Sequence, residues 1–355
     1  MNQKELVDLY TEYLIASPGK TTATGLSILT DNLVSHDKIT RLLASGKINS
    51  KTLWENVKPM CHEIRSEDAV LIFDDSIEEK MYTRSNDLIN WHFDHTVNRK
   101  VKGVNFLSAV YHSNDVSLPI AVEYVHKTIP SINKKGKIVK KSARSKNEMY
   151  RDILRQASYN IEFKYALNDT WFTNAANMNC VVYECYRHFI MEIMGNRKVA
   201  LSQKDKHEGK YVSIKTLELE ARTMSVYLEK VDFPILLSKQ VFKNKDGSTG
   251  ARYLVSSDLS LTYKQITTIY KKRWKVEEYH QSIKSLTSFA KSPTQTVTTQ
   301  TSHFTASIMA FVKLELLKIR RDMNHHALKR WLLLKALRAS SDELKKLLTP
   351  GYVLV

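Results

Sequence analysis

Residues 69–73, Ala-Val-Leu-Ile-Phe, form an unbroken apolar run. A strand that is apolar on both faces has to be covered on both faces, so the run predicts a central strand of a sheet with other elements packed against it. The run ends on Asp74-Asp75, and a second expected strand at 163–167 ends in the same way before Asp169. Acidic side chains are therefore expected at the ends of two buried strands, although such an aspartate can also serve as a turn or cap residue.

The rest of the chain mixes helical and strand patterns, which places it in the α/β class. Residues 1–62 predict short helices, and 198–262 predict a strand-rich segment with a hairpin turn at 244–247. Further strands are expected at 104–112, 118–125 and 188–194, and further helices at 147–158, 264–287, 303–321 and 325–347.

Two of the N-terminal helices, the first starting near Thr22, fit a helix-turn-helix arrangement. Ser35 can cap the second helix, whose apolar side would be formed by Ile39, Leu42 and Leu43, with Arg41 facing outward. The second helix of such a pair can enter a DNA groove. Plain helical packing accounts for the same pattern.

Lysine and arginine exceed aspartate and glutamate by 54 − 37 = 17 across the 355 residues. This surplus favours a polyanionic partner, either nucleic acid or an anionic membrane. No basic amphipathic segment with a bulky apolar face stands out, which favours nucleic acid. Segment 133–146 has basic residues and no acid, and fits either a solvated loop or an arm that contacts DNA phosphates. Its basic residues are Lys134, Lys135, Lys137, Lys140, Lys141, Arg144 and Lys146.

The chain has no apolar run of the roughly 18 residues that span a bilayer, and its first residues alternate charged with apolar side chains. We therefore expect a cytoplasmic protein without membrane contact. The cysteines are too few for a disulfide framework, and the histidines near the first strands lack zinc-ligand spacing. Buried or inert thiols are expected at Cys61, Cys180 and Cys185, and core or surface histidines at His92, His95, His112 and His126.

The helix expected at 264–287 carries Tyr270, Arg273, Glu277 and Lys284 within about 60° of arc, so the four side chains would share one face. An apolar stripe beside that face would dock the helix and leave Glu277 in a cleft between cations suited to phosphates. The simpler alternative is that Arg273 and Glu277, four residues apart, form only a surface ion pair.

Three acids brought together from separate elements suffice for phosphodiester chemistry. Two divalent cations roughly 4 Å apart can stabilise the attacking and leaving oxygens together, and Mg²⁺ prefers oxygen ligands. Asp75, Asp169 and Glu277 are the candidate ligands, with Asp74 as the competitor of Asp75. No serine, cysteine or tyrosine nucleophile with a base beside it stands out, which agrees with direct displacement.

The spacing Tyr270-x2-Arg273-x3-Glu277-x6-Lys284 matches the YREK signature of DDE insertion-sequence transposases, which are bacterial cut-and-paste enzymes. The segment FDDS at 73–76 resembles the first-aspartate motif of that family, and NDTWF at 168–172 resembles the second. Segments 188–201 and 290–302 also resemble related transposases. The resemblance runs from about residue 69 to about residue 315.

The resemblance implies an RNase H-like mixed-sheet catalytic core that a β-rich insertion interrupts. The insertion would explain the gap of 277 − 169 = 108 residues between the second aspartate and the glutamate. The implied domains are an N-terminal helical DNA-binding domain at 1–65, core segments at 66–197 and 263–300, the insertion at 198–262, and C-terminal helices at 301–355.

The resemblance also implies the site. Asp75, Asp169 and Glu277 would bind two Mg²⁺ ions, for which Mn²⁺ substitutes, while Asp74 takes a neighbouring role. Trp274 would either stack on an extruded base or pack in the protein. Related sequences often carry a lysine before the Asn-Arg pair at 196–197, and this chain has Gly195 there instead. The expected DNA contacts are Tyr270, Arg273, Lys284, Trp274, Asn196, Arg197, Lys140, Lys141, Arg144, Lys146, Lys239 and Arg41, with Lys243 and Lys245 as further backbone contacts.

The implied function is DNA transposition in the bacterial cytoplasm, at the nucleoid. The enzyme would bind double-stranded DNA at the terminal inverted repeats, cleave the ends and join the 3′-hydroxyl to target DNA, as a homodimer that pairs the two ends. Two alternatives remain open: an RNase H-like nuclease that does not join strands, and a DNA-binding protein without catalysis.

Overall fold

The computed structural model describes residues 1–95, 97–132, 136–219, 221–243 and 246–348. It divides into two units, Ser50–Tyr279 and a helical unit formed by Met1–Asn49 with His280–Val355. None of the helices in these ranges is both long and apolar enough to cross a membrane.

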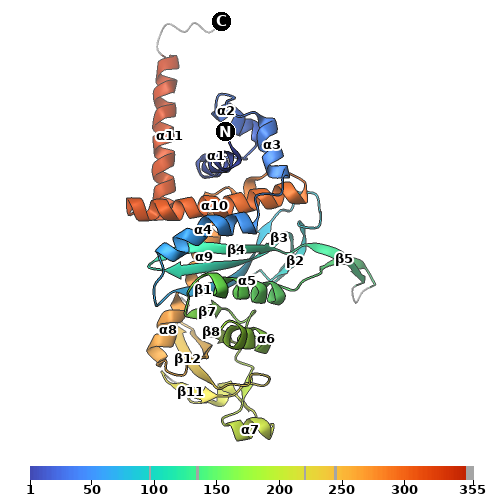
Figure 1. Ribbon diagram of the computed structural model, residues 1–355, viewed down its shortest axis with the longest axis vertical. Coiled ribbons are helices and arrows are strands. Elements are labelled where there is room, and N and C mark those ends of the chain that lie inside the picture. The colour runs from blue at the N-terminus through green and yellow to red at the C-terminus, as the bar shows by residue number, and fades with distance from the viewer. Residues whose placement is uncertain (96, 133–135, 220, 244–245, 349–355) are drawn as a thin grey trace. The chain divides into compact units, whose positions relative to one another are not determined.

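The unit Ser50–Tyr279 is built on a mixed sheet (Figure 1). Strand β1 (Val70–Glu79) pairs antiparallel with β3 (Arg99–Ser113), which pairs antiparallel with β4 (Val116–Tyr124). On its other side β1 pairs parallel with β7 (Tyr165–Asn168), and β7 pairs parallel with β8 (His188–Ile193). Three antiparallel strands followed by two parallel ones are consistent with the expected RNase H-like core.

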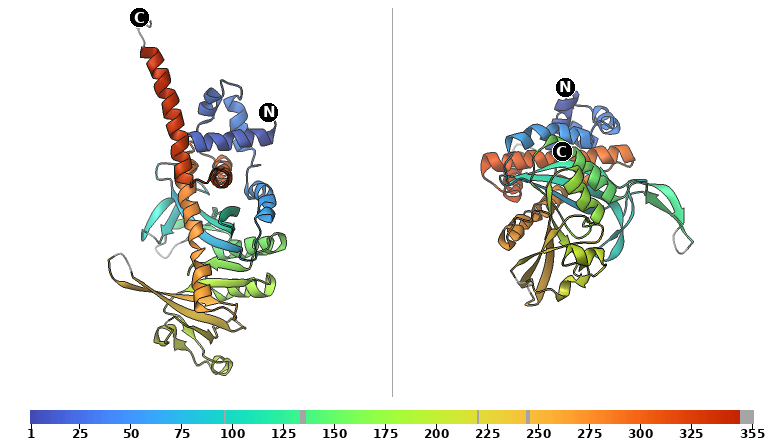
Figure 2. Two further views of the ribbon diagram at one scale, coloured as in Figure 1. Left: turned by 90° about the vertical axis from the view of Figure 1, so that its left-hand side faces the viewer. Right: turned by 60° about the horizontal axis from the view of Figure 1, so that its bottom comes forward.

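The sheet extends beyond these five strands at both edges. Strand β2 (Asn90–Asp94) pairs with β3 at one edge. At the other, β13 (Thr249–Ser256) pairs with β8, followed by β12 (Ile235–Lys243) and β11 (Thr223–Val226). Figure 2 shows the β12–β13 hairpin projecting from this edge. The strands expected within 198–262 are therefore present, and three of them continue the central sheet; a small separate pair is formed by β9 (Lys198–Val199) and β10 (Val212–Ser213).

Helices cover the sheet and connect its strands. Helix α4 (Ser50–Glu63) packs against β4, and α5 (Lys146–Asn160) packs against β3. A capping box of Ser145 and Glu148 starts α5, and its apolar face is buried, which fits an amphipathic connection between β4 and β7. The connection from β7 to β8 holds α6 (Ala175–Asn179) and a π-helical turn, Cys180–Glu184. The short α7 (Gln203–His207) and a 3₁₀ turn (Ile214–Thr216) follow in the segment after β8.

One strand expectation needs correction. Strand β1 does not end at Asp74-Asp75 but continues to Glu79, because β3 keeps pairing with it along that whole length. On the other side β7 pairs only with residues 70–72 of β1, so the parallel ladder stops just before Asp74. The acids thus lie where β1 loses its partner on the β7 side.

The basic segment 133–146 is not simply a loop. Strand β6 (Ile138–Ser142) lies within it and pairs with β5 (Lys127–Ile132), and the resulting hairpin projects from the sheet (Figure 1). The apolar residues of these strands, mostly β-branched, favour extended structure. The basic residues around them drew attention to a loop instead. Lys134 and Lys135 lie outside the described residues, as does Lys245 in the hairpin turn expected at 244–247.

The prediction of a single helix at 264–287 is wrong. The structure has α8 (Tyr263–Lys271) and α9 (Trp274–Leu286), joined by a tighter turn in which Lys272 N–H donates to Ile269 O and Arg273 N–H to Tyr270 O. A tertiary contact accompanies the turn, because Lys272 Nζ donates to the backbone and side-chain oxygens of Asp68. Periodicity within 264–287 carries no information about Asp68, so the break could not be seen in the sequence.

The helical unit contains α1 (Gln3–Ala16), α2 (Ala23–Leu29), α3 (His36–Ala44), the 3₁₀ turn Phe289–Lys291, α10 (Val297–Arg321) and α11 (His325–Leu348). Helices α1 and α3 pack against α10 around one apolar core. Ser35 caps α3 as expected, since its Oγ accepts the Lys38 N–H, and the apolar side of α3 is buried while Arg41 is exposed. The two helices predicted within 22–44 are thus confirmed, and they pack against each other. DNA contact by α3 remains a prediction.

Candidate active site

Asp74 and Asp75 are neighbours in β1, so their side chains leave opposite faces of the strand. Asp74 is half-buried and lies close enough to Asp169 and Arg273 for their charges to act on it. Burial and, after it, the negative charges of Asp169 and Asp75 raise the pKa of Asp74 to about 8, although the Arg273 charge lowers it. Asp74 therefore faces a cluster of like charges.

Asp75 forms an ion pair with a lysine of α5. Its Oδ2 atom lies 2.6 Å from Nζ of Lys146, the first residue of α5, and both side chains are largely buried. The Lys146 ammonium also lies 5.2 Å from the ring centroid of Trp171, in the segment that follows Asp169. Asp75 thus ties β1 to the start of α5.

Asp169 follows β7 and is held by its own loop. Trp171 N–H donates to Asp169 Oδ1 at 3.0 Å, and Thr173 Oγ1 donates to the Asp169 carbonyl at 2.8 Å. Burial raises the pKa of the Asp169 carboxyl; the Trp171 bond and Arg273 lower it, and the charges of Asp75 and Glu192 raise it. Both aspartate side chains thus sit in a site that disfavours their ionised forms.

Arg273 and Glu277 form the ion pair that their spacing allowed, with 2.5 Å between Nη2 and Oε1. It is not a surface pair, because the Arg273 side chain is only 11% exposed and that of Glu277 32%. The Arg273 charge also acts on Asp74 and Asp169. One guanidinium therefore lies among three carboxylates.

Tyr270 lies near this cluster, since the charges of Arg273 and Asp169 act on its hydroxyl. Its hydroxyl lies 3.2 Å from both the Asn168 carbonyl and Glu192 Oε2, to which it can donate. Arg252 on β13 lies 3.2 Å from the same Glu192 oxygen and 5.5 Å from the centroid of the Tyr270 ring. Tyr270 is buried, and burial holds its pKa well above the ordinary value. The hydroxyl thus bonds within the protein and links Asn168 to Glu192.

One functional candidate was missed in the sequence, and another was ranked second. Glu192 is an acid inside the apolar strand HFIMEIM at 188–194, and an acid in such a position is a signal that could have been followed. Asp74 was placed second to Asp75 on motif alignment, and the alternation of side chains along β1 gives it the face toward Arg273.

The other expected DNA contacts differ in their exposure and in their ion pairs. Trp274 is 58% exposed, which excludes the packed alternative for its ring. Lys140 pairs with Asp87 at 2.7 Å and Arg144 with Asp152 at 2.5 Å, while Lys141 is exposed. Lys239 lies half-buried on β12, and Arg41 and Lys284 belong to the helical unit.

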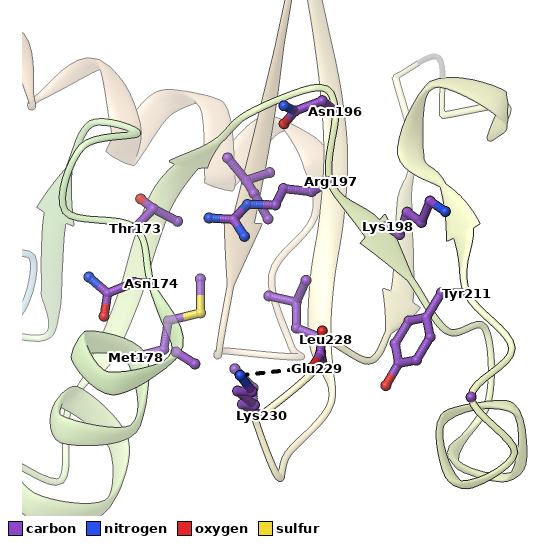
Figure 3. A pocket seen from close by; sticks show the side chains of 14 residues that line it. Thr173, Asn174, Met178, Asn196, Arg197, Lys198, Tyr211, Leu228, Glu229 and Lys230 are labelled. Atoms are coloured by element: carbon purple, nitrogen blue, oxygen red, sulfur yellow. Dashed lines mark ion pairs between the residues drawn. The ribbon is translucent and has the colours of Figure 1, made fainter. Parts of the chain in front are cut away.

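Asn196 and Arg197 follow β8 and line a pocket of about 630 Å³ (Figure 3). Figure 3 shows the Arg197 side chain directed into the pocket toward Thr173 and Met178, while Lys230 and Glu229 form an ion pair at its other side. The pocket is separate from the carboxylate cluster, since none of the acids discussed above lines it.

The thiols and histidines behave as expected. Cys61, Cys180 and Cys185 are buried and unbridged, and His92 and His112 are buried. Within the described ranges no group of three or more histidine, cysteine, aspartate or glutamate side chains has the arrangement of a metal site. The Asp74 and Asp169 carboxylates lie near one another, and the Arg273 charge acts on both.

The mixed sheet carries acids where β1 and β7 stop pairing, and α9 carries a further acid; this arrangement is consistent with an RNase H-like nuclease fold. Comparison with family models agrees, because residues 1–211 match a family described as DDE superfamily endonuclease. The match covers more than half of the chain, which therefore belongs to this family of DNA-cleaving enzymes, typically dependent on divalent metals. It includes Asp74, Asp75 and Asp169 and ends before α8 and α9. Comparison with curated proteins found no match.

Proposed function

We propose that this endonuclease is a DNA transposase, which cleaves the ends of an insertion sequence and joins the freed 3′-hydroxyl to target DNA. The observation that carries the proposal is the cluster of Asp74, Asp169, Arg273 and Glu277. Three carboxylates from β1, the end of β7 and α9 converge there on one guanidinium. The YREK spacing on α8 and α9 supports transposition over simple cleavage.

The donor set suits a hard divalent cation, because carboxylate oxygens are the protein ligands that Mg²⁺ prefers. Asp74, Asp169 and Glu277 would hold two Mg²⁺ ions, and Mn²⁺ would substitute. One guanidinium only partly compensates three negative charges. Burial first, and neighbouring carboxylates second, raise the pKa values of both aspartates. Bound cations of this kind stabilise the attacking and leaving oxygens of an in-line phosphoryl displacement.

We assign the first position to Asp74 rather than to Asp75. Asp74 faces Asp169 and Arg273, whereas Asp75 is already neutralised by Lys146 at 2.6 Å. In this assignment Asp75 is a positioning residue, which anchors α5 to β1 beside the site. The assignment to Asp75 expected from the motif remains the alternative, and single substitutions separate the two.

The expected DNA contacts outside the carboxylate cluster would bind and orient DNA. The net charge of +17 favours contact with a polyanion, and Trp274 offers an exposed indole at the start of α9. Lys284 and Arg41 of the helical unit would contact the terminal inverted repeats. A homodimer would pair the two repeats, so that both ends join target DNA together.

The test uses DNA duplexes that carry the inverted repeats bracketing the gene, with one strand already cleaved to expose the 3′-hydroxyl. Incubation with target plasmid and Mg²⁺ should give joined products. Cleavage of intact ends without joining would identify an RNase H-like nuclease instead. Specific binding of the repeats without any metal-dependent cleavage would identify a non-catalytic DNA-binding protein.

A further inference from the structure

Two pockets of the sheet unit share lining residues of the segment around the end of β8. The first, about 440 Å³, is lined by Thr170, Glu192, Lys215, Arg252 and Tyr253 among others, and Thr170 directly follows Asp169. The second is the 630 Å³ pocket of Figure 3. Both are lined by Ile193 and Asn196, so the two pockets adjoin there, and together they are called here the Asn196 groove. The groove begins next to a proposed catalytic carboxylate and leads away from it.

The lining of the groove is basic. Its two acids are each beside a cation of the lining: Glu192 lies 3.2 Å from Arg252, and Glu229 lies 3.9 Å from Lys230. The lining thus has an excess of 5 − 2 = 3 positive charges among the residues that line both pockets. The remaining cations are Lys215, Arg197 and Lys198. A run of cations along a concave path suits successive phosphates.

The groove also offers one aromatic surface for a nucleobase. Tyr211, which is half-buried, lines its second part (Figure 3), whereas Tyr253, Met178 and Leu228 are buried in the walls. A basic track combined with aromatic side chains is the arrangement by which proteins bind single-stranded nucleic acid.

We propose that the Asn196 groove binds a single-stranded segment of DNA that leaves the carboxylate cluster. The proposal rests on the proposed function, since it names the DNA form that this part of the site takes. The volumes of both pockets lie within the roughly 300–1,000 Å³ typical of small-ligand sites. Pockets of this size suit individual nucleotides and not a duplex. Arg197, directed into the second pocket, contacts a backbone phosphate, and Tyr211 supports a base.

The test measures fluorescence anisotropy of a labelled single strand of about 10 nucleotides, within the usual site size, in the presence of EDTA so that no cleavage occurs. Arg197→Ala should weaken binding about tenfold, the effect of one lost charge-assisted contact. Tyr211→Ala should weaken it roughly 5- to 100-fold by loss of stacking. Arg197→Lys should retain most of the affinity.

The matched control is Lys204→Ala, which removes an exposed lysine of α7 that does not line the groove. It should leave the affinity for the single strand unchanged. Equal effects of Arg197→Ala and Lys204→Ala would overturn the proposal, because the binding would then follow net charge alone. Unchanged binding in both Arg197→Ala and Tyr211→Ala would overturn it as well.

Two further measurements separate the possible ligands. A duplex of the same sequence is measured in parallel. Arg197→Ala should reduce the affinity for the duplex less than it reduces the affinity for the single strand. A deoxynucleoside monophosphate should compete only weakly; competition as strong as that of the oligonucleotide would overturn the DNA strand in favour of a free nucleotide.

The groove and the proposed function can fail independently. Metal-dependent cleavage and joining by the wild type, together with single-strand binding that ignores Arg197 and Tyr211, would refute the groove alone. Binding that depends on both residues, in a protein that never cleaves DNA with Mg²⁺ or Mn²⁺, would refute the catalytic function and leave the groove in place.

Discussion

The Arg273 guanidinium lies 2.5 Å from the Glu277 carboxylate in a largely buried position, and its charge also reaches Asp74 and Asp169. A pair four residues apart on an exposed helix contributes little to stability. This pair instead holds the third carboxylate of the proposed site beside the other two. The consequences for catalysis, stability and pH dependence can each be measured.

The first prediction separates the two neighbouring aspartates. Asp74→Asn and Asp169→Asn should each lower Mg²⁺-dependent cleavage by about 100-fold or more, because each removes a proposed metal ligand. Asp75→Asn should retain more activity, since it loses only the contact with Lys146. Cleavage rates on end DNA measure both effects. If Asp75→Asn is dead and Asp74→Asn active, the first ligand is Asp75.

The second prediction concerns Arg273. Arg273→Gln leaves Glu277 without its buried partner, so the metal-free protein should lose about 1–3 kcal/mol of unfolding free energy at pH 7. Added Mg²⁺ should restore part of that stability, because a cation can take over the compensation of the carboxylates. Thermal unfolding with and without Mg²⁺ provides the measurement. An Arg273→Gln protein whose Tm ignores Mg²⁺ would argue against a metal site at these residues.

The third prediction concerns pH. Burial and like charges raise the pKa of Asp74 from 3.8 to about 8 in the metal-free fold, so the folded state retains a proton that the unfolded chain releases. The stability from this group is present below pH 4 and is lost as pH rises toward 8, by at most about 1.4 kcal/mol per pH unit. Urea unfolding in EDTA at several pH values should show this decline, and Asp74→Asn should reduce it. An identical pH profile in the variant would refute the assignment.

The fourth prediction lies in the helical unit. Glu315 on α10 is 1% exposed and lies 2.7 Å from both Lys318 Nζ and His325 Nε2. Glu315→Gln should therefore cost about 2–4 kcal/mol, since it removes the buried charge that pairs with the partly buried Lys318 and His325. Glu343→Gln on α11, whose exposed carboxylate pairs with Lys346 at 3.1 Å, is the control and should be nearly neutral. Equal loss of Tm in the two variants would contradict the prediction.

The fifth prediction concerns the basic β5–β6 hairpin. Lys140 is occupied by Asp87, whereas Lys141 is exposed, so Lys141 is the better candidate for a phosphate contact. Lys141→Ala should reduce the slope of log K against log[salt] for duplex DNA by about 0.9. The slope should change less in Lys140→Ala. If neither substitution changes the slope, the hairpin does not contact the DNA backbone.

The sequence by itself determined the elements that local chemistry controls. The apolar run at 69–73 and the strand before Asn168 could be recognised, because a buried strand needs apolar side chains on both faces. The Ser35 cap and the inner face of α3 followed from periodicity and capping. The pairing of Arg273 with Glu277 followed from helical spacing alone.

Only the tertiary structure decided what these elements bring together. The break between α8 and α9 accompanies contacts of Lys272 with Asp68, about 200 residues away in the chain. The choice between Asp74 and Asp75 depends on which face of β1 meets Arg273 and which meets Lys146, and the residue pattern within β1 is the same in either case. Electrostatic neighbours and burial are properties of packed surfaces. They exist only once the strands and helices have met.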